Sequence, residues 1–351
     1  MRSRIQHQIK NVKHSFFQLE HGDFNNLLCS KRLAKLAEIS GSYRDKIFTP
    51  VVTLNIFLWQ VLNDNGSCKQ AIAHFISERI SEGLKANSFN TGPYCKARIR
   101  LSLSWIVEEV RRIGLILHTD SGGIWNWKGL NVLLVDGTTI LMPDTEENQK
   151  KYPQQKNQKP GLGFPIARLV GLISLGAGTV VDYAMGEYQG KGTGETSLFS
   201  QLIDSLTAND LLLADRYYCS YAIIMTLQLK GVSFLSRNHP KKKADFRRGI
   251  KLGKKDHIID WLKPKRKPVW MTTEDYDLLP DKLTVREFTV GDTVYLTTLL
   301  DASVYPKNEL AELYKERWKV ELDFRTLKTD LNMLRCKSPG MAEKEIAVRF
   351  M

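Results

Sequence analysis

Two short apolar segments, each followed directly by an aspartate, constrain the fold of this chain more than any other feature of its sequence. Asp136 follows residues 133–135, and Asp215 follows residues 211–214. A short uncharged apolar run is typical of a buried strand. A carboxylate at the end of such a strand lies at the rim of the sheet, where it is held rigidly and stays accessible. The pattern therefore predicts an α/β fold, a mixed sheet covered by helices, and makes both aspartates candidates for a functional site.

Each aspartate also has a purely structural interpretation. Asp136 and Gly137 form an Asp-Gly pair, which is common in turns, so residues 131–144 are predicted to be two strands joined by a turn. Asp215 could instead cap a following helix. For either residue taken alone, the structural interpretation is the commoner one.

A third candidate carboxylate, Glu321, lies in a long predicted helix over residues 308–332. Side chains three, four and seven positions apart share one face of a helix. The stripe that contains Glu321 on this helix consists of Tyr314, Arg317, Glu321 and Lys328. A solvated helix with surface ion pairs would show the same spacing, so the stripe alone does not distinguish the two interpretations.

Three carboxylates from separate elements are the ligand set that a two-metal phosphodiester reaction requires. Mg²⁺ prefers hard oxygen ligands and needs few of them from the protein. Asp136, Asp215 and Glu321 are therefore predicted to hold two Mg²⁺ ions, for which Mn²⁺ can substitute. The glycine-rich residues 186–194 lack the spacing of a nucleotide-binding phosphate loop, so a nucleotide is not expected.

The charge balance indicates a nucleic-acid partner. Lys and Arg number 51 against 38 Asp and Glu, a net charge of +13, and such an excess attracts a polyanion through many phosphate contacts. The five scattered cysteines include no C-x-x-C pair, which argues against a zinc site or a disulfide framework and fits a reducing cytoplasm. No signal sequence is visible, and the longest apolar run, residues 169–181, is too short to cross a bilayer. We expect a cytoplasmic protein without a membrane partner.

The chain is expected to divide into four segments. Residues 1–125 are predicted to form a helical N-terminal DNA-binding domain, because apolar residues recur there at spacings of three and four positions. Residues 126–237 and 301–351 are predicted to be two parts of one α/β core, and residues 238–300 a basic, β-rich insertion within it.

Within the insertion, strands are predicted at residues 269–273, 283–290 and 293–300. Gly291 and Asp292 mark a hairpin turn between the last two.

Two basic stretches contain candidate DNA contacts. Lys96, Arg98 and Arg100 lie at every second position of the N-terminal segment, where a solvated helix start is an equally good explanation. The insertion contributes a second set, for which a disordered solubilising loop is the alternative. The members of this second set are Lys241, Lys242, Lys243, Arg247 and Arg248.

Three motifs resemble one known family. Residues 135–139 (VDGTT), residues 212–218 (LLADRYY) and the Y-x2-R-x3-E-x6-K stripe of the long helix are similar to insertion-sequence DDE transposases of the family-four type. The segments GPYCKARIRL, GTGETSLF and LRCKSP also resemble this family. The resemblance covers the chain from about Leu33 to its end. The resemblance implies a ribonuclease H-like core. In such a core the first aspartate lies on a central strand, the second on a neighbouring strand, and the glutamate on a helix after an inserted β domain.

The resemblance also implies an activity. With divalent ions at Asp136, Asp215 and Glu321, such an enzyme nicks the transposon end, forms a hairpin through the freed 3′-hydroxyl and transfers the strand into target DNA. The implied partner is double-stranded DNA, which is bound by a homodimer.

The resemblance further implies which side chains touch the DNA. The expected phosphate contacts near the cleaved end are Tyr314, Arg317 and Lys328, with Arg216 as a further candidate. Trp261 or Trp270 in the insertion would stack on an extruded base, and packing in the core is the alternative for either ring.

Other functions stay open at this point. Family members usually continue past the segment that matches residues 343–351, so the chain is expected to be truncated at its C-terminus. An inactive or truncated copy would still bind transposon ends but would not cleave them. A metal-dependent nuclease without strand transfer is less consistent with the large basic insertion. Metal-dependent cleavage distinguishes an active transposase from a DNA-binding remnant.

Overall fold

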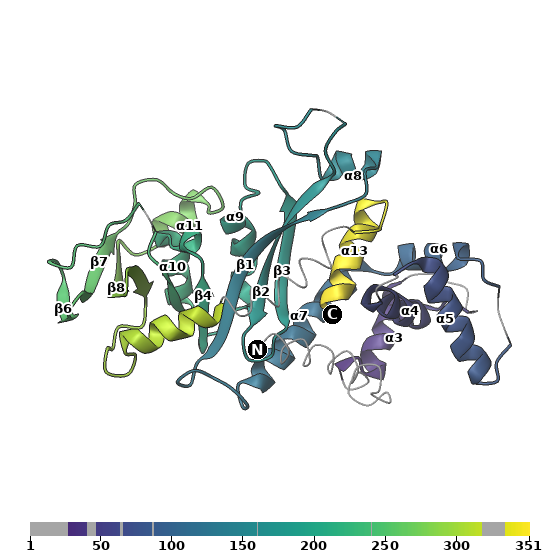
Figure 1. Cartoon of the computed structure of the whole chain (residues 1–351), viewed down its shortest axis with the longest axis horizontal. Helices are drawn as coiled ribbons and strands as arrows, with labels where there is room; N and C mark the ends of the chain where they lie inside the picture. Colours follow the sequence, from purple (N-terminus) through teal and green to yellow (C-terminus); the bar gives the residue numbers. More distant parts are fainter. Residues whose placement is uncertain are drawn as a thin grey trace. The chain divides into compact units, whose positions relative to one another are not determined.

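The computed structural model describes residues 27–40, 47–63, 66–85, 88–159, 161–239, 241–317 and 334–351. The chain divides into two units, Met1–Ile106 and Val107–Met351, and the division falls inside helix α7 (Leu103–Ser121) (Figure 1). Residue 125, the expected end of the N-terminal domain, lies beyond this helix.

Helices make up the first unit as far as the structure describes it. Their bounds are α3 (Ser30–Ile39), α4 (Pro50–Leu62), α5 (Cys68–Ser81) and α6 (Gly92–Arg100). Hydroxyl groups start two of them: the Thr49 side chain accepts a hydrogen bond from the Val52 amide at 3.3 Å, and Ser67 accepts one from Gln70 at 3.2 Å. A small apolar core joins α4, α5 and α6, and it contains Ile56, Ala71, Ile72, Ile76 and Tyr94.

A mixed sheet organises the second unit. Among the described residues it contains nine strands in the order β3-β2-β1-β4-β5-β9-β8-β7-β6. The β1–β4 and β4–β5 pairs are parallel, and all other neighbours are antiparallel. The strands are β1 (Asn131–Leu141), β2 (Ile166–Ser174), β3 (Val180–Glu187), β4 (Asp210–Ala214), β5 (Ser233–Arg237), β6 (Ile250–Gly253), β7 (Asp256–Leu262), β8 (Lys282–Val290) and β9 (Thr293–Thr297).

Helices cover this sheet because its central strands are apolar on both faces. All five residues of β4 are buried, as expected for a parallel strand in the middle of a sheet. Besides most of α7, the described helices of this unit are α8 (Glu146–Lys151), α9 (Glu195–Ser200), α10 (Tyr221–Leu229), α11 (Thr273–Leu278) and α13 (Pro339–Phe350), and residues 307–317 are also helical. Helix α13 packs beside β3, where the rings of Phe350 and Tyr183 lie 5.0 Å apart (Figure 1).

Strand β1 shows that the turn predicted at Asp136 and Gly137 is wrong. The strand is continuous, and each residue from Leu133 to Leu141 has a partner on β2, including Val170 opposite Gly137. In the continuous strand, the backbone N–H and C=O groups of these residues can pair with β2. A turn would leave them without these partners. Asp136 therefore lies inside the strand and does not end it.

The β-rich segment after residue 238 extends the same sheet, because β9 pairs with β5. Strands β8 and β9 are confirmed, and Gly291 between them has a φ of 58°, a conformation that suits glycine in a hairpin turn. The strand predicted at residues 269–273 is wrong. The Thr272 side chain instead accepts a hydrogen bond from the Asp275 amide at 3.0 Å and so starts helix α11.

Candidate active site

The register of two parallel strands brings Asp136 and Asp215 together. Strands β1 and β4 pair in one register from Asn131 opposite Asp210 to Leu134 opposite Leu213. Continuing this register by two residues places Asp136 opposite Asp215. Residues at equivalent positions of neighbouring strands point to the same face, and such strands lie about 4.8 Å apart. The two carboxylates therefore lie side by side.

The end of β4 makes this position accessible. Strand β4 stops at Ala214, whereas β1 continues to Leu141, so the edge of β1 beyond Val135 is not covered by β4. Asp136 is half-buried, and the Asp215 side chain retains 29% of its exposure. Both carboxylates are thus partly exposed at the end of β4.

Asp215 also caps the short helix that follows it, as its structural interpretation predicted. One carboxylate oxygen accepts a hydrogen bond from the Arg216 amide, at the start of the 3₁₀ turn η2 (Arg216–Tyr218). The Arg216 side chain lies 3.8 Å from the same oxygen. Capping fixes the orientation of the Asp215 carboxylate, so the structural and the functional interpretations are compatible.

The helical residues 307–317 contact the same strand end. The Tyr314 hydroxyl donates a hydrogen bond to the Ala214 carbonyl at 3.1 Å, and Arg317 Nη2 lies 3.8 Å from Asp215 Oδ2. Both side chains are 1% exposed. Burial raises the pKa of Tyr314, and the charges of Arg317 and Arg237 partly counteract this rise. These contacts attach the helix to the end of β4, and the predicted phosphate contacts of Tyr314 and Arg317 stay a prediction.

Glu321 and Lys328, the other two members of the predicted stripe, lie outside the described residues. Within the ranges that are described, no three His, Cys, Asp or Glu side chains are grouped as ligands of one ion.

Glu195 and Tyr218 lie close to β1 at this point, although the sequence did not single them out. Glu195 is the first residue of α9, and its carboxyl group lies over Gly137, where an added Cβ would come within 2.6 Å of Glu195 Cδ. Tyr218 is 1% exposed, and its hydroxyl has no hydrogen-bond partner among the described residues. Burial raises the pKa of Tyr218 well above its usual value, and the negative charges of Glu195, Asp136 and Asp215 raise it further. Because successive strand residues point to opposite faces, the Glu195 carboxyl lies on the face of β1 opposite the Asp136 side chain.

Residues 127–351 match the family of the transposase DDE domain. The chain belongs to this family. It is also 28% identical over 308 residues to "Transposase InsG for insertion sequence element IS4" of Escherichia coli (strain K12), a match that covers 84% of this chain and 66% of InsG. "Putative transposase InsZ" of the same organism is 27% identical over 107 residues, which cover 30% of this chain and 35% of InsZ. The chain thus spans just under two thirds of the length of InsG.

One solved structure is also similar, with a lower sequence identity. The piggyBac transposase in a synaptic complex with hairpin DNA has a TM-score of 0.44 and 10% sequence identity, over 93% of this chain and 72% of that chain.

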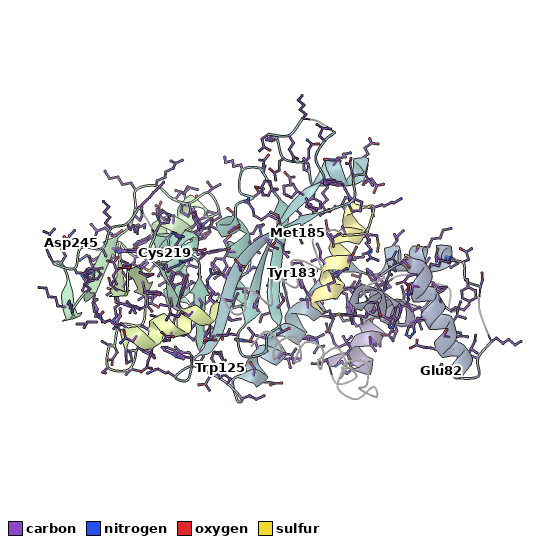
Figure 2. The ribbon with its side chains drawn as sticks, viewed as in Figure 1. Glu82, Trp125, Tyr183, Met185, Cys219 and Asp245 are labelled. Carbon is purple, nitrogen blue, oxygen red and sulfur yellow. The ribbon has the colours of Figure 1, made fainter. Side chains whose placement is uncertain are left out.

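The basic segment at the start of the expected insertion lies within the residues that match the DDE domain. Its predicted DNA contacts are all exposed: Lys241, Lys242, Lys243, Arg247 and Arg248. Arg247 binds both oxygens of Asp245, at 2.8 and 3.1 Å, and these hydrogen bonds lower the pKa of Asp245 to about 2. Figure 2 labels Asp245 at the edge of this domain, near β6 and β7.

Lys242 differs from its neighbours because it covers an aromatic ring. Its ammonium nitrogen lies 3.0 Å from the ring centroid of Trp261, and burial lowers the pKa of Lys242. Trp261 and Trp270 both pack against the core of the DDE domain. Core packing therefore explains the position of each ring in the absence of DNA. Stacking of either ring on a base stays a prediction.

The basic residues of α6 have two different environments. Lys96 and Arg100 are exposed, but Arg98 is buried. The Arg98 guanidinium donates to Gln60 Oε1 at 3.1 Å and lies 5.0 Å from the ring centroids of Phe57 and Tyr94. Residues two apart lie on nearly opposite sides of a helix, which is why every-second spacing does not form one basic face here. Arg98 thus has a structural role in the helical unit.

None of the described helices is both long and apolar enough to cross a membrane.

Proposed function

We propose that this protein is a DNA transposase that cleaves transposon ends and transfers the cut strand into target DNA, with Asp136, Asp215 and Glu321 as its catalytic carboxylates. One observation carries the proposal: the register of β1 and β4 pairs Asp136 with Asp215 at the open end of β4. Membership of the transposase DDE domain family and the similarity to InsG support the same reaction.

The residues at this position fit a divalent cation. Carboxylate oxygens are the ligands that Mg²⁺ and Mn²⁺ prefer, and the Asp136 and Asp215 side chains are both partly exposed at the end of β4. Asp136, Asp215 and Glu321 would hold the cations, which we propose to be two Mg²⁺ ions with Mn²⁺ as a substitute. Cations bound there would activate the attacking and the leaving oxygen of a phosphodiester.

Neighbouring groups orient Asp215 and balance its charge. The capping hydrogen bond from the Arg216 amide orients Asp215, and Arg317 balances its negative charge from 3.8 Å. The exposed side chains of the basic segment and of α6 would bind DNA phosphates, together with Arg216 and Lys328. Trp261 and Trp270 stay the candidates for stacking on an extruded base.

We further propose that the β1–β5 part of the sheet is a ribonuclease H-like core. Asp136 on the central strand β1 and Asp215 after the neighbouring β4 support this assignment. The same proposal includes domain boundaries at residues 125, 237 and 300. It also includes the assembly of a homodimer on double-stranded DNA and a cytoplasmic location.

A cleavage assay tests the proposed function. The full chain is incubated with the end DNA of its own element in Mg²⁺ or in Mn²⁺, beside an Asp215→Asn variant. We expect nicked and hairpin products from the wild type only, with equal end binding by both proteins. End binding without cleavage by the wild type would favour a DNA-binding remnant, and nicking without strand transfer would favour a nuclease.

A further inference from the structure

Tyr217 presents an exposed aromatic ring beside the candidate active site. It lies in the 3₁₀ turn η2, two residues after Asp215, and it is 66% exposed. Successive residues of a 3₁₀ helix point in three different directions, because the helix has three residues per turn. Tyr218, the next residue, takes the direction that leads into the core and is 1% exposed. The same turn therefore holds the Tyr217 ring outside the core.

The strand topology places Tyr217 at the same edge of the sheet as Asp215. Strands β4 and β5 are parallel, and Ala214 pairs with Ser236 near their ends. The segments that follow these two strands therefore leave the sheet side by side. Tyr217 belongs to the first segment and His239 to the second, and their ring centroids lie 6.3 Å apart in an edge-to-face arrangement. In open α/β sheets, ligands bind outside the carboxyl ends of parallel strands.

The charges beside this ring favour a nucleic-acid strand as its ligand. The Arg216 side chain is 41% exposed, and Arg237, the last residue of β5, is half-buried. Proteins bind single-stranded nucleic acid with cations that contact the phosphates and with exposed aromatic rings that stack on the bases. Trp261 and Trp270 pack against the core, whereas Tyr217 is more exposed than either ring.

We propose that Tyr217 is a nucleobase contact, whose ring stacks on the base next to the phosphodiester that is cleaved. This inference rests on the proposed function, which puts the cleaved phosphodiester at Asp215. A base must leave its own stack before it can stack on a side chain, so the contact holds a nucleotide that is unpaired or extruded. Every base has a π-face, so such stacking tolerates any sequence. Tyr217 thus positions the strand and does not read its sequence.

Substitutions at Tyr217 separate stacking from hydrogen bonding. Tyr217→Leu removes the aromatic ring, and Tyr217→Phe removes only the hydroxyl. Trp125→Leu is the matched control. Trp125 is also exposed, at 38%, but it precedes β1 and so lies toward the amino ends of the same parallel strands. Figure 2 labels it well apart from Cys219, which follows Tyr217 by two residues.

The measurement is the affinity of the full-length protein for end DNA of its own element, by fluorescence anisotropy in EDTA. The DNA is already nicked at the cleaved bond, so that the flanking base can leave its stack, and abasic sites are placed one at a time beside the nick. We expect Tyr217→Leu to weaken binding about 5- to 100-fold, the range for one base–aromatic stack. Tyr217→Phe and Trp125→Leu should bind as the wild type does. One abasic position should weaken the wild type to a similar extent and cost Tyr217→Leu nothing more, because both changes remove the same contact.

Cleavage of intact end DNA by the wild type, measured in Mg²⁺, separates this inference from the proposed function. Wild-type affinity in Tyr217→Leu, beside a wild type that cleaves, would overturn the role of Tyr217 and leave the proposed function standing. Weakened binding by Tyr217→Leu, beside a wild type that binds but does not cleave, would overturn the proposed function and keep Tyr217 as a DNA contact. An equal loss in Tyr217→Phe or in Trp125→Leu would contradict stacking by Tyr217. Losses that multiply between Tyr217→Leu and every abasic position would contradict it as well.

Discussion

Asp136 in the middle of β1 and Asp215 directly after β4 occupy equivalent positions on two neighbouring parallel strands. The sheet fixes the backbone of Asp136, the Arg216 amide orients the Asp215 carboxylate, and both side chains are partly exposed. A strand holds a site residue more accurately than a loop does.

Replacing Tyr218 by phenylalanine should stabilise the protein. The Tyr218 hydroxyl is buried without a partner among the described residues, so its removal avoids a desolvation cost of about 1–2 kcal/mol. Urea denaturation would measure the free energy of unfolding. A clear loss of stability would show that the hydroxyl is already satisfied in the protein alone.

Arg98→Ala should destabilise the helical unit. Its guanidinium is hydrogen-bonded to Gln60 in the core, and a buried polar network that loses one member typically costs about 2–3 kcal/mol. The exposed pair Lys96→Ala and Arg100→Ala is the control, since it should leave the thermal midpoint nearly unchanged and weaken DNA binding instead. Equal thermal midpoints for the Arg98→Ala variant and the wild type would contradict a structural role of Arg98.

Neutralising four of the exposed cations of the basic segment should affect DNA binding and not folding. Lys241, Lys243, Arg247 and Arg248 are changed together to glutamine, and Lys242 is kept because it covers Trp261. Affinity for end DNA should fall steeply at low salt, because several phosphate contacts are lost. End binding equal to that of the wild type would indicate that these residues serve solubility alone.

Lys328→Ala should lower the salt dependence of end binding. Removing one phosphate contact reduces the slope of log K against log salt by about one unit. Asp323→Ala on the same predicted helix is the control. Should Asp323→Ala cause an equal loss, damage to the helix would explain both results.

The sequence was sufficient for those features that depend on local pattern. The apolar runs before Asp136 and Asp215 predicted buried strands, and alternation with a Gly-Asp turn predicted the β8–β9 hairpin. The predicted turn at Gly137 was wrong because the decisive interaction is pairing with β2, about 30 residues away, and no local signal in an Asp-Gly pair reports it.

The residues around the aspartates were harder to find for the same reason. Glu195 reaches Gly137 only because α9 packs back on the sheet, and the burial of Arg98 depends on contacts with α4. A glycine directly after Asp136, inside a strand, was the one available signal, since glycine in a strand often marks a close approach by another group.

The most direct test of the central claim compares single and double replacements of the two aspartates. Cleavage of end DNA in Mg²⁺ is measured for Asp136→Asn, Asp215→Asn and the double variant, with end binding measured in parallel. If the aspartates act on one cation site, each single change should slow cleavage about 10³-fold or more, and the double change should cost little beyond that. End binding should stay near the wild-type level in all three. Cleavage that persists in either single variant, or losses that multiply in the double variant, would contradict a shared catalytic site.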